Sequence, residues 1–426
     1  MTDELIVLLA GQEIGRVLRG RGGRLSFQYG SRWQGRPDAY PLSLSMPLAL
    51  SDHSHTKIEA FMWGLLPDNE KVIDRWASQY HVSPRSAFAL LTYVGEDCAG
   101  AVQFIPPERL RRLQPQPSKS EIAWLTETEV AERLRRLRTD HAAWRSPSDT
   151  GQFSLAGAQP KTALVLEDGK WGIPSGRIPT THILKPPTGE WDGHAENEHF
   201  CLELARVLGL TVPNSSVMRF GHERAIVIER YDRLRAQGFL VRLHQEDMCQ
   251  ALGLPPTRKY ENEGGPGIKE IVDLLRNHSS RPDEDTQMFL DVIAFNWIIA
   301  GTDAHAKNYS VLIGSGGSVR LAPLYDLASI LPYKNMSLMR AKLAMKIGGI
   351  YRLRNIGIRQ WTRLAAEVRV EADHLLARMV RFAEDLPDHA SDIKKRIEAD
   401  GLLHPVITKL AQAVTARATQ CRRLLS

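Results

Sequence analysis

Residues 301–308 read Gly-Thr-Asp-Ala-His-Ala-Lys-Asn and follow an apolar segment, residues 288–300, that we expect to form the most deeply buried helix of the chain. The spacing from Asp303 to Asn308 is that of the Asp-x-x-x-x-Asn loop of phosphotransferases. In such a loop the Asp accepts the proton of the attacking hydroxyl, and the Asn holds a metal ion bound to the nucleotide phosphates. The spacing alone is a weak indication, because a helix that ends in a polar turn can carry the same two residue types by chance.

The residues after this loop predict a β-hairpin that leads to a second carboxylate. Two apolar runs, residues 309–313 and 319–321, flank the turn sequence Gly314-Ser315-Gly316-Gly317. The hairpin would deliver Asp326 beside the loop, which is the order found in kinases. There the carboxylate binds Mg²⁺ that bridges the phosphate oxygens, since little else offsets the charge at the transferred phosphate. The alternative role for Asp326 is that of a turn-forming residue.

A kinase also needs a cation for the α- and β-phosphates, and His182-Ile183-Leu184-Lys185 supplies an apolar strand that ends in a lysine. We expect a helix over residues 196–208, ended by Gly209, to follow this strand. Glu198 in the first turns of this helix would pair with Lys185, because an unpaired buried lysine is costly. Glu196 competes for this role.

Two further segments suit a nucleotide site. Residues 154–161, Ser-Leu-Ala-Gly-Ala-Gln-Pro-Lys, are mostly small, precede a predicted strand and would form a loop over the phosphates. The chain has no Gly-x-Gly-x-x-Gly loop, and this segment lacks the first glycine and the Gly-Lys pair of a Walker A motif, which argues against a P-loop NTPase. Residues 227–232 lie where the two expected lobes meet, and their position makes them the candidate hinge for adenine.

Six ordered blocks of the chain together resemble the HipA family of bacterial toxin kinases. The resemblance extends to the amino-terminal region, in Pro41-Leu42-Ser43-Leu44-Ser45 and Gly64-Leu65-Leu66-Pro67-Asp68, and to the loop over residues 259–267. It therefore covers nearly the whole chain. The six blocks are residues 154–162, 182–186, 229–233, 245–250, 302–308 and 325–326.

The resemblance implies an ATP-dependent serine/threonine protein kinase with an α+β, two-lobed protein-kinase-like fold. A sheet-rich N-terminal lobe would carry an extra α+β module, and the C-terminal lobe would be all-helical. The resemblance also implies that Asp303 is the general base and that Lys185 binds the phosphates of ATP. Asn308 and Asp326 would be the ligands of Mg²⁺. The other nucleotide-binding residues that it implies are Ala156, Gly157, Ala158, Gln159, Pro160, Lys161 and Thr162 in the loop over the phosphates, Glu229 and Tyr231 at the hinge, and His305 and Lys307 beside the phosphates.

Ser154 matches the serine that the family autophosphorylates, a modification that ejects the loop and shuts the kinase off. A phosphate adds about −1.5 to −2 charges, which repel ATP inside a nucleotide pocket. The chain departs from the family pattern at Pro160, where an acidic residue is usual, and at Ala304, where a glycine commonly follows the catalytic Asp. Neither change removes a reacting group, but the proline would stiffen the loop and alter how readily Ser154 is released.

The resemblance also implies partners. Members of the family phosphorylate an aminoacyl-tRNA synthetase, most typically glutamyl-tRNA synthetase, which slows growth and promotes persistence. Their helix-turn-helix antitoxin, HipB, binds operator DNA, and toxin and antitoxin together repress their own operon. Residues 404–426 contain four basic side chains and no acid, so this segment is either a solvated helix face or a DNA contact. These side chains are Lys409, Arg417, Arg422 and Arg423.

Length and composition agree with a soluble protein of several domains. The 426 residues carry 55 Lys and Arg against 49 Asp and Glu, a net charge of +6, and 43% of them are hydrophobic, enough for packed cores. The chain lacks a run of about 18 apolar residues and its first residues are acidic, so we expect neither a membrane span nor export. Its 4 cysteines form no Cys-x-x-Cys pair, which favours a reducing compartment and hence a cytoplasmic protein.

Apolar runs and turn residues divide the chain into four parts. Residues 1–108 would form an α+β module, a small sheet covered by two helices that Pro67 separates. Residues 109–150 would be a proline-rich linker and a short helix that starts at the capping box Thr126-Glu127-Thr128-Glu129. Residues 151–240 would be the N-lobe of the kinase, and residues 241–426 a helical C-lobe with the catalytic and metal-binding loops.

Two other functions fit parts of this pattern. A small-molecule phosphotransferase uses the same arrangement of Asp, Asn and Asp around a metal. A DNA-binding corepressor with a dead nucleotide site is the other alternative. The intact set of Lys185, Asp303, Asn308 and Asp326 argues against the latter.

Overall fold

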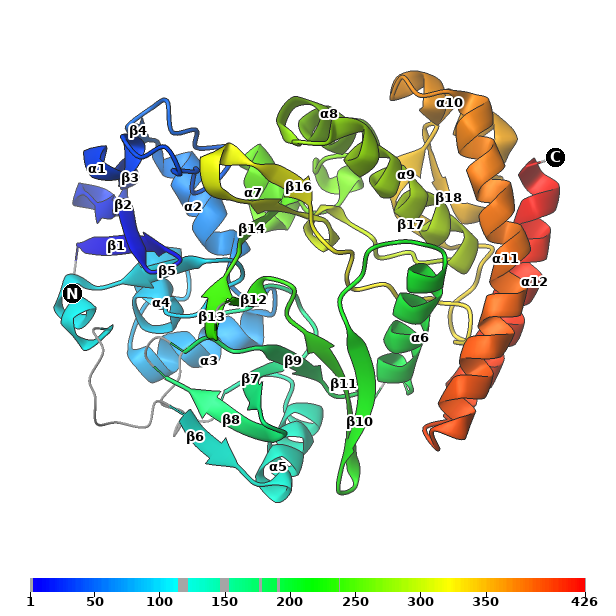
Figure 1. The fold of residues 1–426 in the computed structure, drawn as a ribbon, viewed down its shortest axis with the longest axis horizontal. Coiled ribbons are helices and arrows are strands. Elements are labelled where there is room, and N and C mark those ends of the chain that lie inside the picture. Colours follow the sequence, from blue (N-terminus) through cyan, green and yellow to red (C-terminus); the bar gives the residue numbers. More distant parts are fainter. Residues whose placement is uncertain are drawn as a thin grey trace.

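The computed structural model describes residues 3–113, 122–145, 153–175, 178–189, 192–236 and 238–425. Two sheets lie towards the amino terminus and a mainly helical region towards the carboxyl terminus, as the progression from blue to red shows (Figure 1). The predicted α+β class, with a sheet-rich first part and a helical last part, is confirmed.

The first sheet belongs to the N-terminal module, here residues 3–105, and has the strand order β4-β3-β2-β1-β5. Its strand β1 (Glu4–Leu9) is buried on both faces, which explains its unbroken apolar sequence. Helix α2 (His55–Gly64) packs on β3, and α3 (Glu70–Tyr80) and α4 (Ala87–Val94) follow, so the predicted sheet and the two helices around Pro67 are confirmed. The other elements are β2 (Gln12–Arg19), β3 (Leu25–Tyr29), α1 (Ser31–Gln34), β4 (Asp52–His53) and β5 (Val102–Ile105).

The second sheet has six antiparallel strands in the order β10-β11-β9-β7-β8-β6. Helix α6 (His194–Val207) follows β9 and packs on β10 and β11, two residues earlier at its start than predicted. It ends before Gly209, whose φ of 83° lies in the left-handed region that favours glycine. The strands are β6 (Ile122–Leu125), β7 (Thr162–Glu167), β8 (Lys170–Pro174), β9 (His182–Lys185), β10 (Ser215–Phe220) and β11 (Glu223–Glu229).

Residues 109–150, predicted as a proline-rich linker and a short helix, contain that helix and also supply a strand to the second sheet. Strand β6 pairs with β8, and helix α5 (Glu127–Thr139) packs on β10 and β11. The predicted capping box is confirmed, since the Thr126 and Glu129 side chains each accept from the other's backbone amide. A strand of only four residues after a proline-rich segment gave no periodicity to detect.

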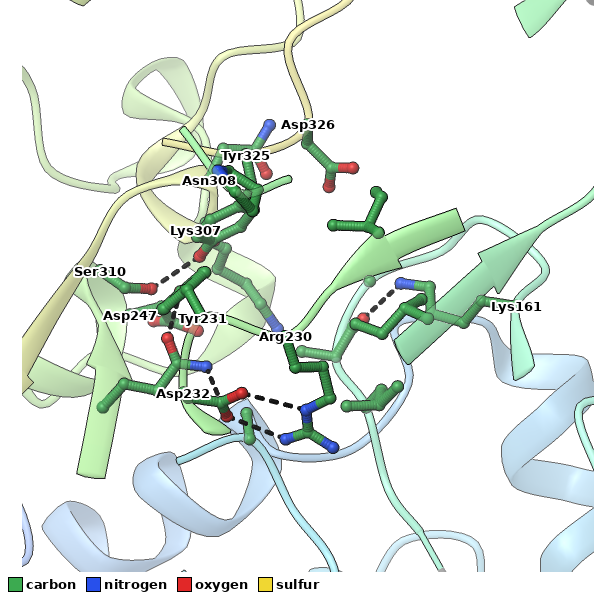
Figure 2. A pocket seen from close by; sticks show the side chains of 18 of the residues that line it. Lys161, Arg230, Tyr231, Asp232, Asp247, Lys307, Asn308, Ser310, Tyr325 and Asp326 are labelled. Carbon is green, nitrogen blue, oxygen red and sulfur yellow. Dashed lines mark hydrogen bonds and ion pairs between the residues drawn. The ribbon is translucent and has the colours of Figure 1, made fainter. Parts of the chain in front are cut away.

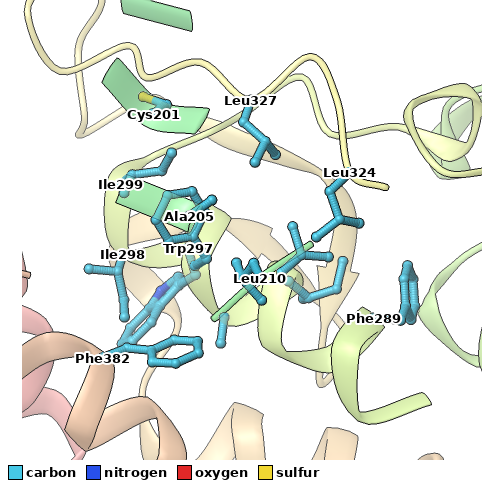
Figure 3. Close-up of a cluster of buried hydrophobic side chains, with 14 of the residues drawn as sticks. Cys201, Ala205, Leu210, Phe289, Trp297, Ile298, Ile299, Leu324, Leu327 and Phe382 are labelled. Atoms are coloured by element: carbon cyan, nitrogen blue, oxygen red, sulfur yellow. The ribbon is translucent and has the colours of Figure 1, made fainter. Parts of the chain in front are cut away.

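Helix α9 (Pro282–Ile299) forms the centre of the C-terminal region, as its apolar sequence predicted. Trp297, Ile298 and Ile299 are fully buried and lie among side chains of other elements, including Phe382 (Figure 3). A helix that is apolar on all sides is stable only when it is covered on all sides. Helices α8 (Ile268–His278), α11 (Ala372–Ala399) and α12 (Pro405–Leu425) pack on it, and α10 (Ile358–Glu367) reaches it through the ring contact of Trp361 with Trp297. The remaining helix of this region is α7 (Met248–Leu252).

The prediction that the C-terminal lobe is all-helical is too strict. The predicted hairpin over residues 309–321 is present as β15 (Ser310–Ile313) and β16 (Val319–Leu321), and β14 (His244–Asp247) adds a third strand. Strand β15 is the central strand of this small sheet, and the residue before it, Tyr309, accepts from the backbone amide of Met248 at 3.0 Å. Two hairpins complete the described strands: β12 (Arg233–Ala236) with β13 (Phe239–Arg242), and β17 (Lys342–Ile347) with β18 (Ile350–Arg352).

The basic residues near the carboxyl terminus do not form one exposed patch. Arg417 is buried, and its guanidinium lies 5.6 Å from the ring centroid of Trp297. Arg422 forms an ion pair with Glu384 at 3.4 Å. Arg417 therefore cannot reach DNA without leaving the core. Within the described ranges, no helix combines the length and the apolar character needed to cross a bilayer.

Candidate active site

Three charged side chains from distant segments meet at the end of β9. Lys185 Nζ donates to Glu198 Oε1 at 2.7 Å and also to Asp326 Oδ1. The Lys185 and Glu198 side chains are only 7% and 1% exposed. Of the two acids that the sequence left open, the structure joins Glu198 to the lysine, whereas Glu196 accepts from Arg224 at 3.1 Å.

This cluster sets the charge of its members. Burial opposes the charge of Lys185, but Asp326 and Glu198 together raise the lysine's pKa above its ordinary value. Burial also acts to raise the pKa of Asp326, yet the ammonium groups of Lys185 and Lys161 hold it well below the usual range. Burial raises the pKa of Glu198 to about 7, since its attraction to Lys185 is partly cancelled by repulsion from Asp326. A charged lysine and a charged aspartate thus face each other at neutral pH.

The backbone at Asp326 is unusual. Its φ of 55° lies in the left-handed region, where residues other than Gly, Asn and Asp are rare. The preceding residue, Tyr325, donates its hydroxyl to the backbone oxygen of Lys307 at 2.8 Å. This bond joins the Asp326 segment to the loop of residues 303–308, here called the catalytic loop. Aspartate tolerates this conformation, so the local backbone and the bond from Tyr325 together set the place of the Asp326 carboxylate.

The catalytic loop presents Asp303 to solvent and keeps Asn308 inside. Asp303 is exposed, and its Oδ1 accepts from the hydroxyl of Tyr260 at 2.7 Å. Asn308 Nδ2 donates to the backbone oxygen of Asp303 at 2.9 Å, which leaves Oδ1 as the amide atom suited to a metal ion. His305 is buried, and burial lowers its pKa, so the ring is neutral at pH 7.

Lys307, which also belongs to the catalytic loop, has a partner that the sequence did not indicate. Lys307 Nζ lies 2.7 Å from Asp68 Oδ1, and Lys259 Nζ lies 3.0 Å from the other oxygen of the same carboxylate. Asp68 belongs to the N-terminal module. A separation of 239 residues along the chain leaves no spacing pattern from which this contact could have been read.

The phosphate loop, residues 154–161, is folded against the N-terminal module. Ser154 is fully buried, and its hydroxyl donates to the backbone oxygen of Leu65 at 2.8 Å. Lys161 turns back so that its ammonium donates to the oxygen of Ala156 at 2.6 Å. Burial lowers the pKa of Lys161 to about 8, with a further contribution from Lys185.

The hinge segment places Glu229 and Tyr231 on either side of a buried arginine. Arg230 donates to both carboxylate oxygens of Asp232, at 3.0 and 2.8 Å, and it lies 3.4 Å from Asp97 of the N-terminal module. The Tyr231 hydroxyl donates to the side chain of Gln245. The sequence marked this segment only by its position, and the ion pairs that fix it were not predicted.

Two adjoining cavities connect these parts. The inner cavity extends from the hinge to the lysines and is lined by Lys161, Lys185 and Lys307, with Asn308 and Asp326 across from Lys161 (Figure 2). The outer cavity reaches Asp303 and Glu198. Most predicted site residues line one cavity or both. Thr162 lines neither, because it lies in β7 opposite Leu184, and Ser154 lines neither, because its hydroxyl is buried against Leu65. The two cavities share Asp68, Gly157, His305, Asn308 and Asp326.

Asn308 and Asp326, which line both cavities, suit a Mg²⁺ ion that also binds phosphate oxygens better than they suit a metal ion bound by protein side chains alone. Among the described residues, no group of 3 or more His, Cys, Asp or Glu side chains is placed to hold a metal ion. Asn308 and Asp326 supply one amide oxygen and one carboxylate, which is the small protein share that Mg²⁺ takes when phosphates provide the rest. The residues therefore fit the ion that the sequence predicted.

Comparison with known proteins identifies the family. The family model of the HipA N-terminal domain matches residues 5–105, and that of the HipA-like C-terminal domain matches residues 153–390. The predicted kinase Y4mE of Sinorhizobium fredii is 35% identical over 97% of both chains. The serine/threonine-protein kinase toxin HipA of Shewanella oneidensis is 30% identical over 86% of this chain and 83% of its own.

A solved structure gives the same result. It is the complex of HipA, HipB and operator DNA from Shewanella oneidensis, and one of its chains superposes with a TM-score of 0.84 and 25% identity. The superposition covers 99% of this chain and 98% of the other. The chain described here belongs to the HipA family of serine/threonine-protein kinase toxins.

Proposed function

We propose that this chain is an ATP-dependent serine/threonine protein kinase and the toxin of a toxin–antitoxin pair. The observation that carries the proposal is the meeting of Lys185, Glu198 and Asp326 beside a cavity that extends to Asp303. Buried charges with displaced pKa values are costly to the fold and are concentrated at functional sites. The family to which the chain belongs supports the same reading.

Asp303 acts as the general base in this proposal. Its Oδ1 is held by Tyr260, and Oδ2 accepts the proton of a serine or threonine hydroxyl. The hydroxyl oxygen attacks the γ-phosphorus while the bond to the oxygen of the leaving ADP breaks. The exposure of Asp303 suits a protein substrate, whose hydroxyl has to reach the base from solvent.

The remaining site residues hold the nucleotide. Lys185 stays protonated and binds the α- and β-phosphates, and Glu198 orients its ammonium. Asn308 and Asp326 would hold Mg²⁺, and the ion would offset the negative charge of the phosphates. Residues 156–161 cover the phosphates, with His305 and Lys307 beside them. Adenine takes the hinge end of the cavity, at Glu229 and Tyr231.

Ser154 is the regulatory site of this kinase. Its hydroxyl is fully buried, so it can accept a phosphate only after the phosphate loop has left the N-terminal module. A group with about −1.5 to −2 charges cannot return to a buried position that offers a backbone carbonyl as its partner. Lys161 leaves the cavity together with the loop, which switches the kinase off. Pro160 stiffens the loop and alters how readily Ser154 is released.

The family supports the proposed partners, and the cysteines support the proposed compartment. The complex of the Shewanella oneidensis relative supports a HipB-like antitoxin and, through it, operator DNA as partners of this chain. The substrate is an aminoacyl-tRNA synthetase, with glutamyl-tRNA synthetase as the first candidate, and its phosphorylation arrests translation and promotes persistence. All four cysteines are free and buried, which suits the cytoplasm.

With the proposed kinase function, the chain divides into four parts. Residues 1–108 are the N-terminal module of the family, and residues 241–426 form the C-lobe with the catalytic and metal-binding loops. Residues 109–150 connect the module to the kinase, although their β6 and α5 are built into the sheet of the N-lobe. The rest of the N-lobe, residues 151–240, carries the phosphate loop, the lysine strand and the hinge.

Incubation with ATP and Mg²⁺, followed by mass spectrometry, tests the proposal. The purified protein is mixed with a cytosolic extract, and phosphopeptides are compared with those of an Asp326→Asn variant. We expect phosphoserine or phosphothreonine on a synthetase and on Ser154 in the wild type only. Phosphate found only on a metabolite would favour a small-molecule phosphotransferase. Absence of both transfer and ATP binding would favour a DNA-binding corepressor.

A further inference from the structure

A short segment of the N-terminal module lies between the two loops of the active site. This segment, Leu65 to Asp68, joins α2 to α3. On one side the Leu65 oxygen accepts from Ser154, and the Asp68 amide donates to the oxygen of Gly157 at 3.1 Å. Pro67 and Gly157 also form a parallel bridge. The segment thus supports the phosphate loop through its backbone.

On its other side the segment contacts the catalytic loop through the Asp68 carboxylate. The side chains of Asp68 and Lys307 are 11% and 3% exposed, and they are 2.7 Å apart. Both oxygens of this carboxylate have a lysine partner, since Lys259 Nζ lies 3.0 Å from the second one. A buried ammonium that lost this partner would be left without a counter-charge and would have to move.

Lys307 is tied through its backbone to the residues that carry the chemistry. It precedes Asn308, and its backbone oxygen accepts from Tyr325, the residue before Asp326. The Asp68–Lys307 pair therefore fixes the position of an ammonium in the inner cavity and restrains both proposed metal ligands.

The N-terminal module is itself held firmly on the C-terminal region. The backbone amide of Leu44 donates to Glu246 Oε1 at 2.7 Å, and Gln250 Nε2 donates to the oxygen of Phe61 at 2.9 Å. The hydroxyls of Ser43 and Ser45 donate to the backbone oxygen of Gln250 at 3.2 and 3.0 Å. These bonds give the segment of Asp68 a defined place relative to the catalytic loop.

We propose that Asp68 is a positioning residue of the kinase, and that the N-terminal module is an integral part of the active site rather than an appended domain. Asp68 acts by holding Lys307 against the phosphates and by linking the catalytic loop to the phosphate loop. The inference rests on the proposed kinase function and deepens it, because the catalytic residues alone, all within residues 153–390, would then form an incomplete site.

A double-mutant cycle on the full-length chain tests this inference. The variants are Asp68→Asn, Lys307→Met and the two combined, each measured for transfer of labelled phosphate from ATP and for ATP affinity by calorimetry. We expect Asp68→Asn to lower transfer on the order of 100-fold, as a misplaced catalytic group does. Because the two residues act as a unit, the double variant should be no worse than Lys307→Met.

Two further variants separate positioning from a general loss of stability. Asp38→Asn removes an acid of the same module that forms an exposed ion pair with Arg36, and it should leave transfer unchanged. Asp68→Glu keeps the charge and should regain part of the lost rate. If Asp68→Asn does not fold, Asp68→Glu takes its place in the double-mutant cycle.

The outcomes decide between the possibilities. Wild-type transfer by Asp68→Asn, or losses that multiply in the double variant, would overturn the positioning role while leaving the kinase intact. A wild-type protein that transfers no phosphate would remove both the proposed function and this inference.

Discussion

Lys185 Nζ lies 2.7 Å from Glu198 Oε1 in a pair that is almost wholly shielded from water. Desolvating two charges costs about as much as their attraction returns, so well-packed apolar residues would stabilise the fold at least as well. The pair is better explained by the function of the ammonium, which also contacts Asp326 and lines the inner cavity.

Replacing Lys185 by Met should lower phosphate transfer on the order of 100-fold or more, because the phosphates lose their fixed cation. The free energy of unfolding should fall by less than the roughly 3–5 kcal/mol typical of a broken buried pair. Glu198 can take up a proton instead, since burial already raises its pKa to about 7. Labelled-ATP kinetics and urea unfolding measure the two effects. The exposed Lys170→Met is the matched control. Unchanged kinetics in Lys185→Met would rule out a phosphate-binding role.

Glu246 makes the stability of the chain depend on pH. Burial raises its pKa from the ordinary value of 4.5 to about 8 in the folded protein. The folded state therefore binds the proton more tightly than the unfolded chain does. This contribution to stability is fully present below about pH 4.5 and is lost as the pH rises towards 8.

Glu246→Gln should therefore match the wild type near pH 4 and exceed its free energy of unfolding by roughly 5 kcal/mol at pH 9. The amide oxygen of Gln can still accept from the Leu44 amide. Urea unfolding at the two pH values measures the difference. The exposed Glu263→Gln should change neither value. If the variant is no more stable than the wild type at pH 9, ionisation of Glu246 costs the folded state little free energy, and the prediction is wrong.

The parts of this molecule that could be predicted from sequence are those whose signal is local. Asp303, Asn308 and Asp326 are spaced by one loop and one hairpin, and Lys185 ends an apolar strand. The strand β6 was not predicted, because four residues are too few to show an alternation of apolar and polar side chains. The three-stranded sheet of the C-terminal region was not predicted as a whole. Its strand β14 pairs with a strand more than 60 residues away, and no local pattern indicates such a pairing.

Contacts between the N-terminal module and the kinase region could not be predicted in this way. Asp68 meets Lys307, and Asp97 meets Arg230, across separations of 239 and 133 residues. A single sequence carries no pattern at such distances. The resemblance marked residues 64–68 as characteristic of the family, but it gave no reason for their presence. The structure supplies one, since this segment contacts both loops of the site.

Gly64→Ala should destabilise the joint between the module and the C-terminal region. A Cβ atom at this position would lie 2.6 Å from Gln250 Cγ. The Gln250 side chain cannot give way easily, because its two ends bond to Phe61 and Asp247. We expect a loss of about 1–3 kcal/mol, typical of overpacking. Thermal unfolding measures it, with Gly189→Ala as the control, since no atom lies within 4 Å of a Cβ there. Equal unfolding temperatures for the two variants would contradict a tight joint.

Ser154→Ala should separate regulation from catalysis. It removes one hydrogen bond to Leu65, worth about 0.5–1.5 kcal/mol, and leaves the cavity residues in place. Prolonged incubation with ATP and Mg²⁺ should inactivate the wild type progressively as Ser154 becomes phosphorylated, whereas the variant should stay active. Activity followed together with the intact mass tests this. Equal inactivation of both proteins would show that Ser154 is not the switch.

The most direct test of the central claim is single-turnover phosphate transfer by Asp303→Asn. The exchange keeps the shape of the side chain and its contact with Tyr260 but removes the base. We predict a rate about 10²–10⁴-fold below that of the wild type, with ATP affinity unchanged. Transfer at the wild-type rate would contradict the assignment of Asp303 as the base and, with it, this account of the site.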